Sequence, residues 1–228
     1  MVFNNQAFKD TNISKIKNIK ENIDIISCEL DGCTLERIQL ISGFENLIDA
    51  SMSTIKNSKL KKLKLLYGEG FKECSVSDCE FDDVYINHLN MEKCSFDRIK
   101  INRVVISGLH STETKFVDLK GTNIDFSVVK FINPLFSGME INHFVYANNC
   151  ILGGTFENIN IENGYVSENN IDKTEFKNVV WKKTTFRKNS FQDIDFTSTE
   201  FVECEFDRCE FHNCFFTEEQ KKQIGLEN

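Results

Sequence analysis

A period of five residues runs through most of this 228-residue chain. Counting back in fives from Phe216 to Val76 gives 29 positions, and 27 of them are apolar or aromatic; the exceptions are Ser111 and Gly121. With 40% hydrophobic residues overall, chance would supply only about 12. Internal repetition therefore constrains the fold before any local secondary structure is considered.

A second column lies two residues before the first. It holds small or apolar residues such as Cys74, Val84 and Ile99, whereas the other three columns are mostly polar or charged. Neither regular element has this period: a helix advances by about 100° per residue and would spread the apolar positions around its whole surface, and a strand alternates with period two. A turn-like unit that hides two side chains and exposes three, repeated along a coiled chain, forms a solenoid.

Units such as CEFDD at 79–83, CSFDR at 94–98 and CEFDR at 204–208 resemble those of the pentapeptide-repeat proteins. In that family a small residue stands first, Asp or Asn often second, and Leu or Phe at the centre. The resemblance covers 74–216 without a slip and 23–65 less regularly. It implies an all-β fold, a right-handed quadrilateral parallel β-helix with one unit per side and four units per coil.

Four units per coil place residues 20 apart on the same side. We expect the aromatic rings of one such file to stack, because neighbouring strands lie about 4.8 Å apart. This file contains Phe96, Phe116, Phe136, Phe156, Phe176, Phe196 and Phe216.

Asparagine occupies the inward small position in another file, at Asn149, Asn169 and Asn189. A buried amide without a partner costs about 1–3 kcal/mol. Stacked identical amides can instead hydrogen-bond from coil to coil. We therefore expect a structural asparagine ladder in the interior.

The two exceptions in the central column follow large residues at the small position, Leu109 before Ser111 and Leu119 before Gly121. We expect each leucine to fill the volume that its neighbour leaves empty, since protein interiors are close-packed. Proline and glycine are rare, with Pro134 the only proline and 11 glycines. These residues usually mark turns, so another device must turn this backbone.

The whole chain, 1–228, is expected to form one solenoid domain with four parts. Residues 1–22 form an irregular N-terminal cap, 23–70 irregular repeats, 71–216 regular repeats and 217–226 a C-terminal helix. Register breaks at 42–51 and 65–71 are candidate loops or bulges. Thr217 to Gln220 match a capping box and Gly225 can end the helix. Packing of Ile224 or Leu226 on Phe211 and Phe216 would cap the array; the alternative role of this end is homodimerisation.

The cysteines of the last repeats, Cys204, Cys209 and Cys214, allow three interpretations: a metal cluster, a disulfide framework or a repeat. Zinc sites favour two to four residues between paired cysteines, and these are four apart on different sides of the coil. We interpret them as core thiols and expect no metal, disulfide or cofactor. A packed interior without charge from 74 to 216 leaves no pocket for catalysis, so we expect no enzyme activity.

Charge points to the outer surface. The chain carries 27 basic and 35 acidic residues, net −8, and residues 66–228 alone carry 17 and 27, net −10. This balance disfavours nucleic acid and anionic membranes as direct partners. The start lacks a signal peptide, so we expect a cytoplasmic protein. The candidate binding surface comprises two acidic groups: Asp78, Glu80, Asp82 and Asp83, and Asp193, Asp195, Glu200, Glu203, Glu205, Asp207 and Glu210.

The resemblance implies one specific function. Several pentapeptide-repeat proteins are acidic, dimeric rods that imitate duplex DNA, bind DNA gyrase or topoisomerase IV, and protect these enzymes from quinolones or peptide toxins. About seven coils make a rod of about 35 Å, over which B-DNA carries about 20 charges, twice the net charge here. The alternative is an interaction scaffold for another protein partner, with no role at topoisomerases.

Overall fold

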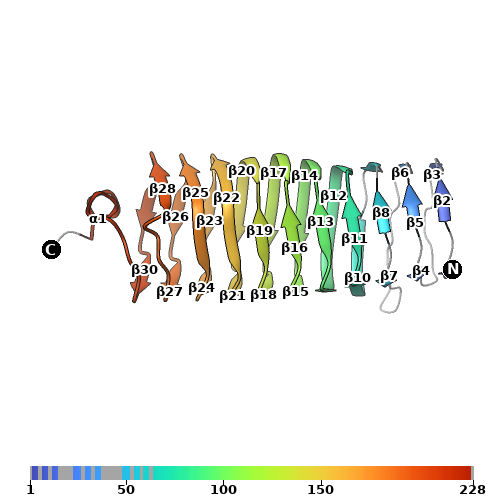
Figure 1. The fold of residues 1–228 in the computed structure, drawn as a ribbon, viewed down its shortest axis with the longest axis horizontal. Coiled ribbons are helices and arrows are strands. Elements are labelled where there is room, and N and C mark those ends of the chain that lie inside the picture. Colours follow the sequence, from blue (N-terminus) through green and yellow to red (C-terminus); the bar gives the residue numbers. More distant parts are fainter. Residues whose placement is uncertain are drawn as a thin grey trace.

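The computed structural model describes residues 71–226 throughout and, before them, the backbone of strands β1 to β10. The fold is an elongated solenoid of parallel strands with one short helix at its C-terminal end (Figure 1). In the regular part each strand pairs with the strand one coil later, as Val76 does with Phe96 and Phe96 with Phe116. The expected fold class, a parallel β-helix of four five-residue units per coil, is confirmed.

Most strands occupy one side of the coil each. On the first side lie β2 (Ala7–Lys9), β5 (Glu29–Asp31), β8 (Thr54–Lys56), β11 (Ser75–Ser77), β13 (Ser95–Asp97), β16 (Lys115–Val117) and β19 (Leu135–Ser137). On the second side lie β3 (Asn12–Ser14), β6 (Thr34–Glu36), β9 (Lys59–Lys61) and β28 (Thr199–Val202).

The remaining single-side strands belong to the third and fourth sides. The third side has β23 (Tyr165–Ser167), β26 (Thr185–Arg187) and β29 (Glu205–Asp207). The fourth side has β1 (Val2–Asn4), β4 (Ile23–Ile26), β7 (Ile48–Ser51), β15 (His110–Thr112), β18 (Lys130–Ile132), β21 (Cys150–Leu152), β24 (Asn170–Asp172), β27 (Ser190–Gln192) and β30 (Glu210–His212).

Seven longer strands continue around a corner. β22 (Thr155–Glu162) and β25 (Glu175–Lys182) join the first and second sides; β14 (Lys100–Ser107), β17 (Lys120–Ser127) and β20 (Glu140–Ala147) join the second and third. β10 (Lys64–Lys72) joins the third and fourth, and β12 (Glu80–Glu92) covers the second, third and fourth. Helix α1 (Glu218–Ile224) follows the last coil.

The register changes near both breaks expected from the sequence. β4 pairs with β7 so that Ile23 lies opposite Ile48, which makes this coil one repeat unit longer than the regular coils. Residues 42–47 of that break lie outside the described residues. In β10 the register with β12 shifts between Gly68 and Phe71, as in a β-bulge. The extra residue at 65–71 is therefore absorbed inside a strand rather than in a loop.

Non-glycine residues turn the corners of the coil. Twenty-five of them in the described part have φ between 49° and 61°, and every one is the residue two after a central position, as in Asp78, Asp83 and His88. Seven are asparagine and four are aspartate, the residues that tolerate the left-handed region best. This repeated left-handed residue explains how the chain coils with so few glycines and prolines.

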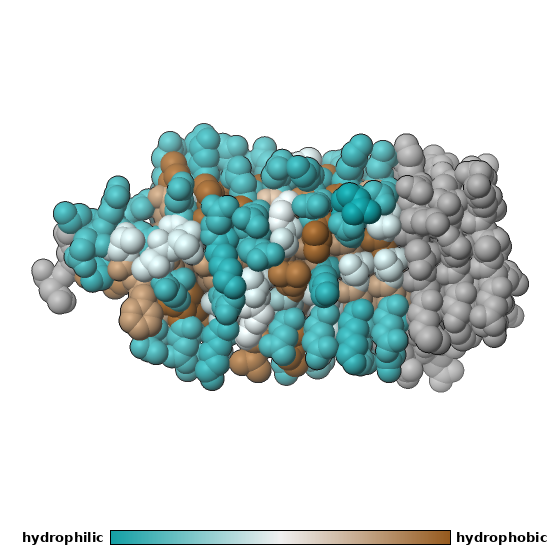
Figure 2. All heavy atoms as spheres, in the orientation of Figure 1, coloured by the Kyte–Doolittle hydropathy of each residue, from teal (hydrophilic) through white to brown (hydrophobic). Residues whose placement is uncertain are grey.

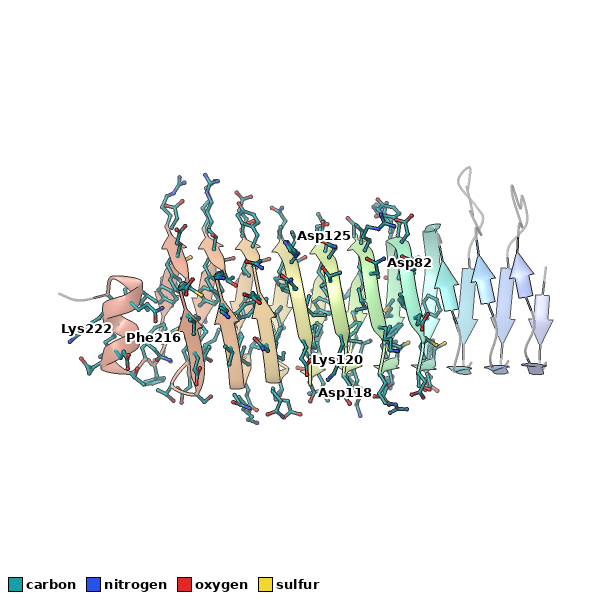
Figure 3. All side chains as sticks on the ribbon, turned by 90° about the horizontal axis from the view of Figure 1, so that it is seen from above. Asp82, Asp118, Lys120, Asp125, Phe216 and Lys222 are labelled. Carbon is teal, nitrogen blue, oxygen red and sulfur yellow. The ribbon has the colours of Figure 1, made fainter. Side chains whose placement is uncertain are left out.

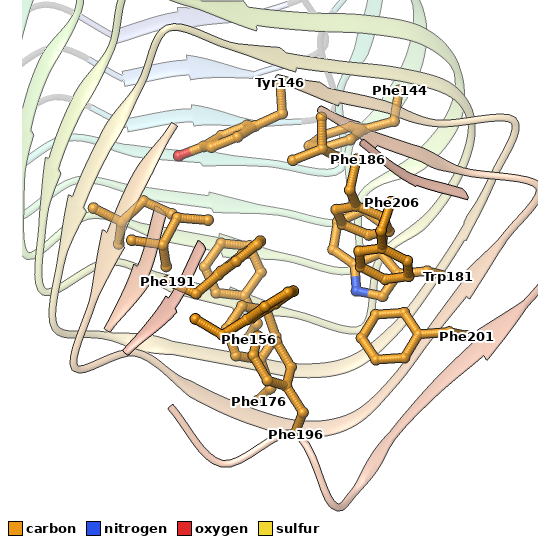
Figure 4. Close-up of a pocket in the computed structure, with 14 residues that line it drawn as sticks. Phe144, Tyr146, Phe156, Phe176, Trp181, Phe186, Phe191, Phe196, Phe201 and Phe206 are labelled. Atoms are coloured by element: carbon orange, nitrogen blue, oxygen red, sulfur yellow. The ribbon is translucent and has the colours of Figure 1, made fainter. Parts of the chain in front are cut away.

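The interior is filled by the two inward columns. Along the first side, the rings from Phe96 to Phe216 lie 4.7–5.3 Å apart from one coil to the next, with interplanar angles of 8–34°. Figure 4 shows Phe156, Phe176 and Phe196 in file on the first side, with Phe201 on the adjacent second side and Phe186 and Phe206 on the opposite, third side. The cavity that these rings line is only about 20 Å³, which is room for about one water molecule.

The three inward asparagines bond mainly to backbone rather than to one another. Each Oδ1 accepts the backbone N–H of the residue one coil earlier, at 2.7–3.1 Å. Each Nδ2 donates to the backbone carbonyl of a central residue on the preceding coil, at 2.8 Å. The only bond between side-chain amides of this file runs from Asn169 Nδ2 to Asn189 Oδ1, 2.8 Å. The amides therefore cross-link successive coils through the main chain.

Tyr146 is the polar exception inside the lumen. Its side chain is 3% exposed, and its hydroxyl has no hydrogen-bond partner among the described residues. Burial raises the pKa of this phenol well above its usual value. Figure 4 shows the Tyr146 side chain inside the coil, with its hydroxyl pointing away from Phe144.

Replacing Tyr146 with phenylalanine should stabilise the protein. Removing a buried hydroxyl without a partner is expected to raise the free energy of unfolding by about 1–2 kcal/mol. Equilibrium denaturation in urea at neutral pH measures the difference. Tyr165, on the outside of the next coil and 39% exposed, is the matched control, because its replacement with phenylalanine should change little. A loss of stability in the Tyr146→Phe variant would show that the hydroxyl has a partner.

Candidate interaction surface

The interior offers no site for chemistry in the described part of the chain. The cavity is lined by aromatic and aliphatic side chains. Residues 71–226 contain no group of three or more His, Cys, Asp or Glu side chains positioned to hold a metal ion. Within the same range no helix is long and apolar enough to cross a membrane. The candidate binding residues predicted from the sequence all lie on the outer surface.

The thiols of Cys204, Cys209 and Cys214 stay in the inward column and line the last coil. They are partly exposed, and burial raises the pKa of each. Cys204 and Cys214 donate to backbone carbonyls one coil earlier, at 3.2 and 3.5 Å. Thiols held in this way are poor nucleophiles at neutral pH, because the thiolate is the reactive form.

The first acidic group, Asp78 to Asp83, lies on the second side and its two corners. Arg98, one coil later, binds Asp78 through two hydrogen bonds of 2.7 and 2.8 Å, and this bonding lowers the pKa of the carboxyl group. Arg103 lies 4.0 Å from both Asp82 and Asp83. Glu80 is in register between Lys59 and Lys100. Basic residues of adjacent coils thus neutralise most of this group.

The second acidic group, Asp193 to Glu210, forms a ring around one coil rather than a stripe along the rod. Glu210 already lies opposite Ser190 of the preceding coil, so this span nearly completes one turn and its carboxylates face different sides. Asp207 pairs with Arg187 and Arg208, at 3.3 and 2.9 Å. Asp193 accepts a hydrogen bond of 2.7 Å from Asn213, which lowers the pKa of its carboxyl group.

Three exposed carboxylates of this ring are not neutralised. Glu200 lies on the second side, Glu203 at the corner that follows it, and Glu205 at the start of the third side. None of the three forms an ion pair with the described residues. Glu210 has only His212 nearby, at 3.5 Å. These carboxylates thus leave uncompensated acidic charge on the last coil.

Charges alternate along the rod. Lys120 bonds Glu140 at 2.7 Å, Lys188 bonds Glu168 at 3.1 Å, and Lys182 lies 3.6 Å from Glu162. Each pair joins equivalent positions on neighbouring coils. Figure 2 shows a mostly hydrophilic first side with scattered hydrophobic residues. No axial file of the described part carries the unbroken line of negative charge that a DNA strand has.

The repeat itself breaks at 195–198. Ser198 is the one corner residue from 73 to 213 that does not adopt a left-handed conformation. Here Asp195 Oδ1 accepts hydrogen bonds from the amide and hydroxyl of Thr197, at 2.9 and 2.7 Å, which lower the pKa of the carboxyl group. The altered turn borders an open hollow of about 500 Å³ lined by charged and polar residues, including Lys173 and Lys177.

The C-terminal end is only partly covered by α1. The helix has the expected capping box, between Thr217 and Gln220, and Gly225 ends it in the left-handed region. Gln220, rather than Ile224 or Leu226, is the residue it buries, and the Gln220 side chain donates to the carbonyls of Phe196 and Thr199 at 2.8 and 2.6 Å.

Leu226 stays 44% exposed beside a hollow of about 790 Å³ over the rings of Phe211 and Phe216. Gln220 therefore anchors the helix through polar contacts, and Leu226 does not form the expected apolar cap, whereas Ile224 is half-buried. Figure 3 shows α1 beside Phe216 at the end of the rod.

The third side contains residues that the sequence did not single out. Its outward file reads Tyr85, Val105, Asp125, Val145 and Tyr165 on successive coils. Beside it runs a file of small residues: Asn87, Ser107, Ser127, Ala147 and Ser167. Both files are visible in the sequence at the spacing of one coil. They stand in the outward columns, however, whose residues vary from unit to unit and do not follow the five-residue pattern.

No family model matches the chain, and no curated protein matches its sequence. Solved structures do match its fold. The full-length structure of QnrB1, a plasmid-mediated fluoroquinolone resistance protein, aligns over 99% of this chain and 98% of its own, with a TM-score of 0.50 and 11% identity. A trypsin-treated QnrB1 variant aligns over 79% and 96%, with a TM-score of 0.53 and 11% identity.

HetL, a pentapeptide repeat protein from a Nostoc cyanobacterium, is more distant, with a TM-score of 0.29, 8% identity and coverage of 87% and 86%. The QnrB1 alignments extend over nearly the whole solenoid. At 11% identity they show the fold alone. Together with the strand pairing from coil to coil, they confirm the resemblance to pentapeptide-repeat proteins at the level of the fold.

Proposed function

We propose that this chain is a non-catalytic interaction scaffold that binds a protein partner through its outer surface. The observation that carries this proposal is the contrast between the two faces of the sheets. The inward side chains fill the lumen and leave cavities of only about 20 Å³ each, whereas the outward columns form files held in register by backbone pairing from coil to coil. Such a surface can present side chains at fixed spacing without any moving part.

Binding from a host-cell extract tests this function. The full chain, immobilised through its N-terminus, should retain a protein that then binds the purified chain saturably in calorimetry. A heat-unfolded sample on the same support controls for adhesion to exposed hydrophobic residues. If no retained protein binds the folded chain in solution, the scaffold proposal is wrong.

A second candidate function is DNA mimicry at a type II topoisomerase. Two observations favour it: the alignment with QnrB1, a fluoroquinolone resistance protein, over nearly the whole of both chains, and the net charge of −10 over residues 66–228. The alternating charges weaken it, since a mimic needs negative charge along the rod. Within this hypothesis the three free carboxylates, Glu200, Glu203 and Glu205, are the part of the described surface best suited to a DNA-binding groove.

A DNA gyrase supercoiling assay with and without ciprofloxacin tests the mimicry. A mimic should inhibit supercoiling at micromolar concentration or restore it in the presence of the drug, and replacing Glu200, Glu203 and Glu205 with glutamine should reduce the effect. Replacing the ion-paired Glu140, Glu162 and Glu168 with glutamine is the control with equal charge change. Absence of both effects with folded protein would exclude this function and leave the scaffold proposal intact.

The C-terminal end is the proposed site of homodimerisation. Phe206, Phe211 and Phe216 remain partly exposed there, and Phe215 is 58% exposed. Pairing of two such ends would cover these rings, as repeat arrays require at their ends. Sedimentation equilibrium should then give a dimer for the wild type and a monomer for Phe215→Glu. A monomeric wild type at high micromolar concentration would contradict this assignment.

A further inference from the structure

The third side differs from the others in charge. We call the ten outward strand residues from Tyr85 to Ser167 on this side the third-side strip: Tyr85, Asn87, Val105, Ser107, Asp125, Ser127, Val145, Ala147, Tyr165 and Ser167. Only one of the ten is charged. The equivalent ten positions of the second side, on the same coils, include six charged residues.

The one charge of the strip lies at its centre and has no countercharge. Asp125 is half-buried between Val105 and Val145, its neighbours in the file. Its Oδ1 is shielded from solvent and has no hydrogen-bond partner among the described residues, and Ser127 is the one side chain that partly offsets the effect of burial on the pKa of the carboxyl group. Burial raises the pKa of this carboxyl group. The folded protein therefore holds a carboxylate where its ionised form is disfavoured.

A second anomaly lies three residues away, at the adjoining corner. Val128 has φ 57° and is 61% exposed. A β-branched residue in the left-handed region is a conformational outlier, and such strain collects at functional sites. The corner positions one coil before and after are Gly108 and Asn148, which tolerate this conformation. The chain thus keeps a strained, exposed apolar side chain beside the uncompensated carboxylate.

We infer that the third-side strip docks a helix of a partner protein whose apolar surface carries one lysine or arginine over Asp125. This inference rests on the proposed scaffold function and names the surface and the chemistry of its partner. The cation would provide the countercharge that the rod lacks, and Val128 would lie against the apolar side chains around it.

The dimensions of the strip suit a helix. Its five coils extend over about 19 Å, at about 4.8 Å per coil, the length of about 13 helical residues at about 1.5 Å each. Three extended residues between corners give a width of about 10 Å, close to the diameter of a helix, about 10–12 Å. The small, half-buried side chains of Ser107, Ser127 and Ala147 leave room between the tyrosines at the two ends, whereas Ser167, on the last coil of the strip, is itself buried. A second copy would offer Asp125 no cation from its own strip.

Replacing Asp125 should weaken binding of the partner without lowering the stability of the protein. This combination distinguishes a binding role for Asp125 from a structural role. Asp125→Asn removes a half-buried charge and should leave the melting temperature at pH 7 unchanged or higher. Because the folded-state pKa is raised, the wild type is most stable below the unfolded-state pKa of Asp and loses stability as pH rises through the folded value. The Asn variant should lose this component of the pH dependence.

Site-specific photo-crosslinking identifies the partner. A photoreactive amino acid at Ala147, in the strip, should crosslink a host protein through a helix that contains a lysine or arginine, whereas the same group at Asn142, on the second side of the same coil, should not. The purified partner should then bind Asp125→Asn at least about 10-fold more weakly than wild type. Asp118→Asn is the control, since Asp118 is exposed at the opposite edge of the second side (Figure 3).

Each contrary result has a distinct meaning. Crosslinks at position 142 but not at 147 would overturn the strip while the scaffold function stands. A crosslinked segment without a basic residue, or equal affinity for Asp125→Asn and wild type, would overturn the role of Asp125. A crosslink to another copy of this chain would replace the partner helix with self-association. Failure to crosslink from any outward position would count against the scaffold function itself.

Discussion

Replacing Asn169 with leucine should lower the free energy of unfolding by about 2–6 kcal/mol, because two buried backbone groups, the N–H of Asn149 and the carbonyl of Tyr146, would each lose a partner at a cost of about 1–3 kcal/mol. Asn189 Oδ1 would keep the backbone N–H of residue 169. The Asn169 amide accepts the N–H of Asn149 at 2.8 Å and donates to the carbonyl of Tyr146 and to Asn189 Oδ1, each at 2.8 Å. Leucine has a similar volume but can neither donate to nor accept from these groups.

Urea denaturation followed by circular dichroism measures this loss. Asn170→Leu is the matched control, because Asn170 is the next residue in the chain and is exposed on the outside of the coil. Its replacement should change the free energy of unfolding by less than about 0.5 kcal/mol. If Asn169→Leu also changed it by less than that, the amide would have no cross-linking role between the coils.

The two inward columns made the coil predictable in detail. The five-residue period separates buried from exposed positions without knowledge of any contact, so the phenylalanine file and the inward asparagines follow from counting alone. The bonding of the asparagines does not. Stacked amides were expected to bond one another, but the parallel strands present an unpaired N–H and C=O to each amide at closer reach. Backbone geometry, which the period does not specify, decided between the two partners.

The corners show a similar limit. The scarcity of glycine and proline required another turning device, but composition could not name it. The structure assigns it to one left-handed residue per unit, including lysines, arginines and Val128. Each costs about 1 kcal/mol relative to an extended conformation, and the backbone bonds between coils offset that cost. The conformational preferences of single residues would predict against a left-handed conformation at these positions. The backbone bonds that repeat from coil to coil make it favourable.

The acidic surface was the least predictable part. Two runs rich in Asp and Glu were grouped by their nearness in sequence, but a coiled chain distributes such a run around the whole perimeter. Residues are neighbours along the rod when they occupy equivalent positions of successive coils, as Arg98 and Asp78 do, and Lys120 and Glu140. The same spacing brings Val105, Asp125 and Val145 together. Surface sites on a solenoid must therefore be sought at the period of the coil.

Gly121 provides the sharpest test of the coil spacing. The sequence suggested that Leu119 fills a volume left by the missing side chain, and Leu119 is indeed buried. The backbone supplies a stronger reason for glycine. With φ 150°, a Cβ atom at this position would lie 1.9 Å from the carbonyl oxygen of Ile101 and 2.8 Å from its carbon. An alanine cannot be accommodated unless the two coils separate.

Gly121→Ala should therefore lower the free energy of unfolding by about 3 kcal/mol or more, through steric overlap and an unfavourable backbone conformation together. Gly225→Ala is the control, since Gly225 also has positive φ, 73°, but no atom lies within 4 Å of the added Cβ. It should cost only the conformational part, about 1 kcal/mol. Thermal and urea denaturation of both variants compare the two costs. Equal losses would mean that the coils at Ile101 and Gly121 can separate locally. The backbone pairing and the side chains around it would then absorb the overlap, and the neighbouring strands would keep their register.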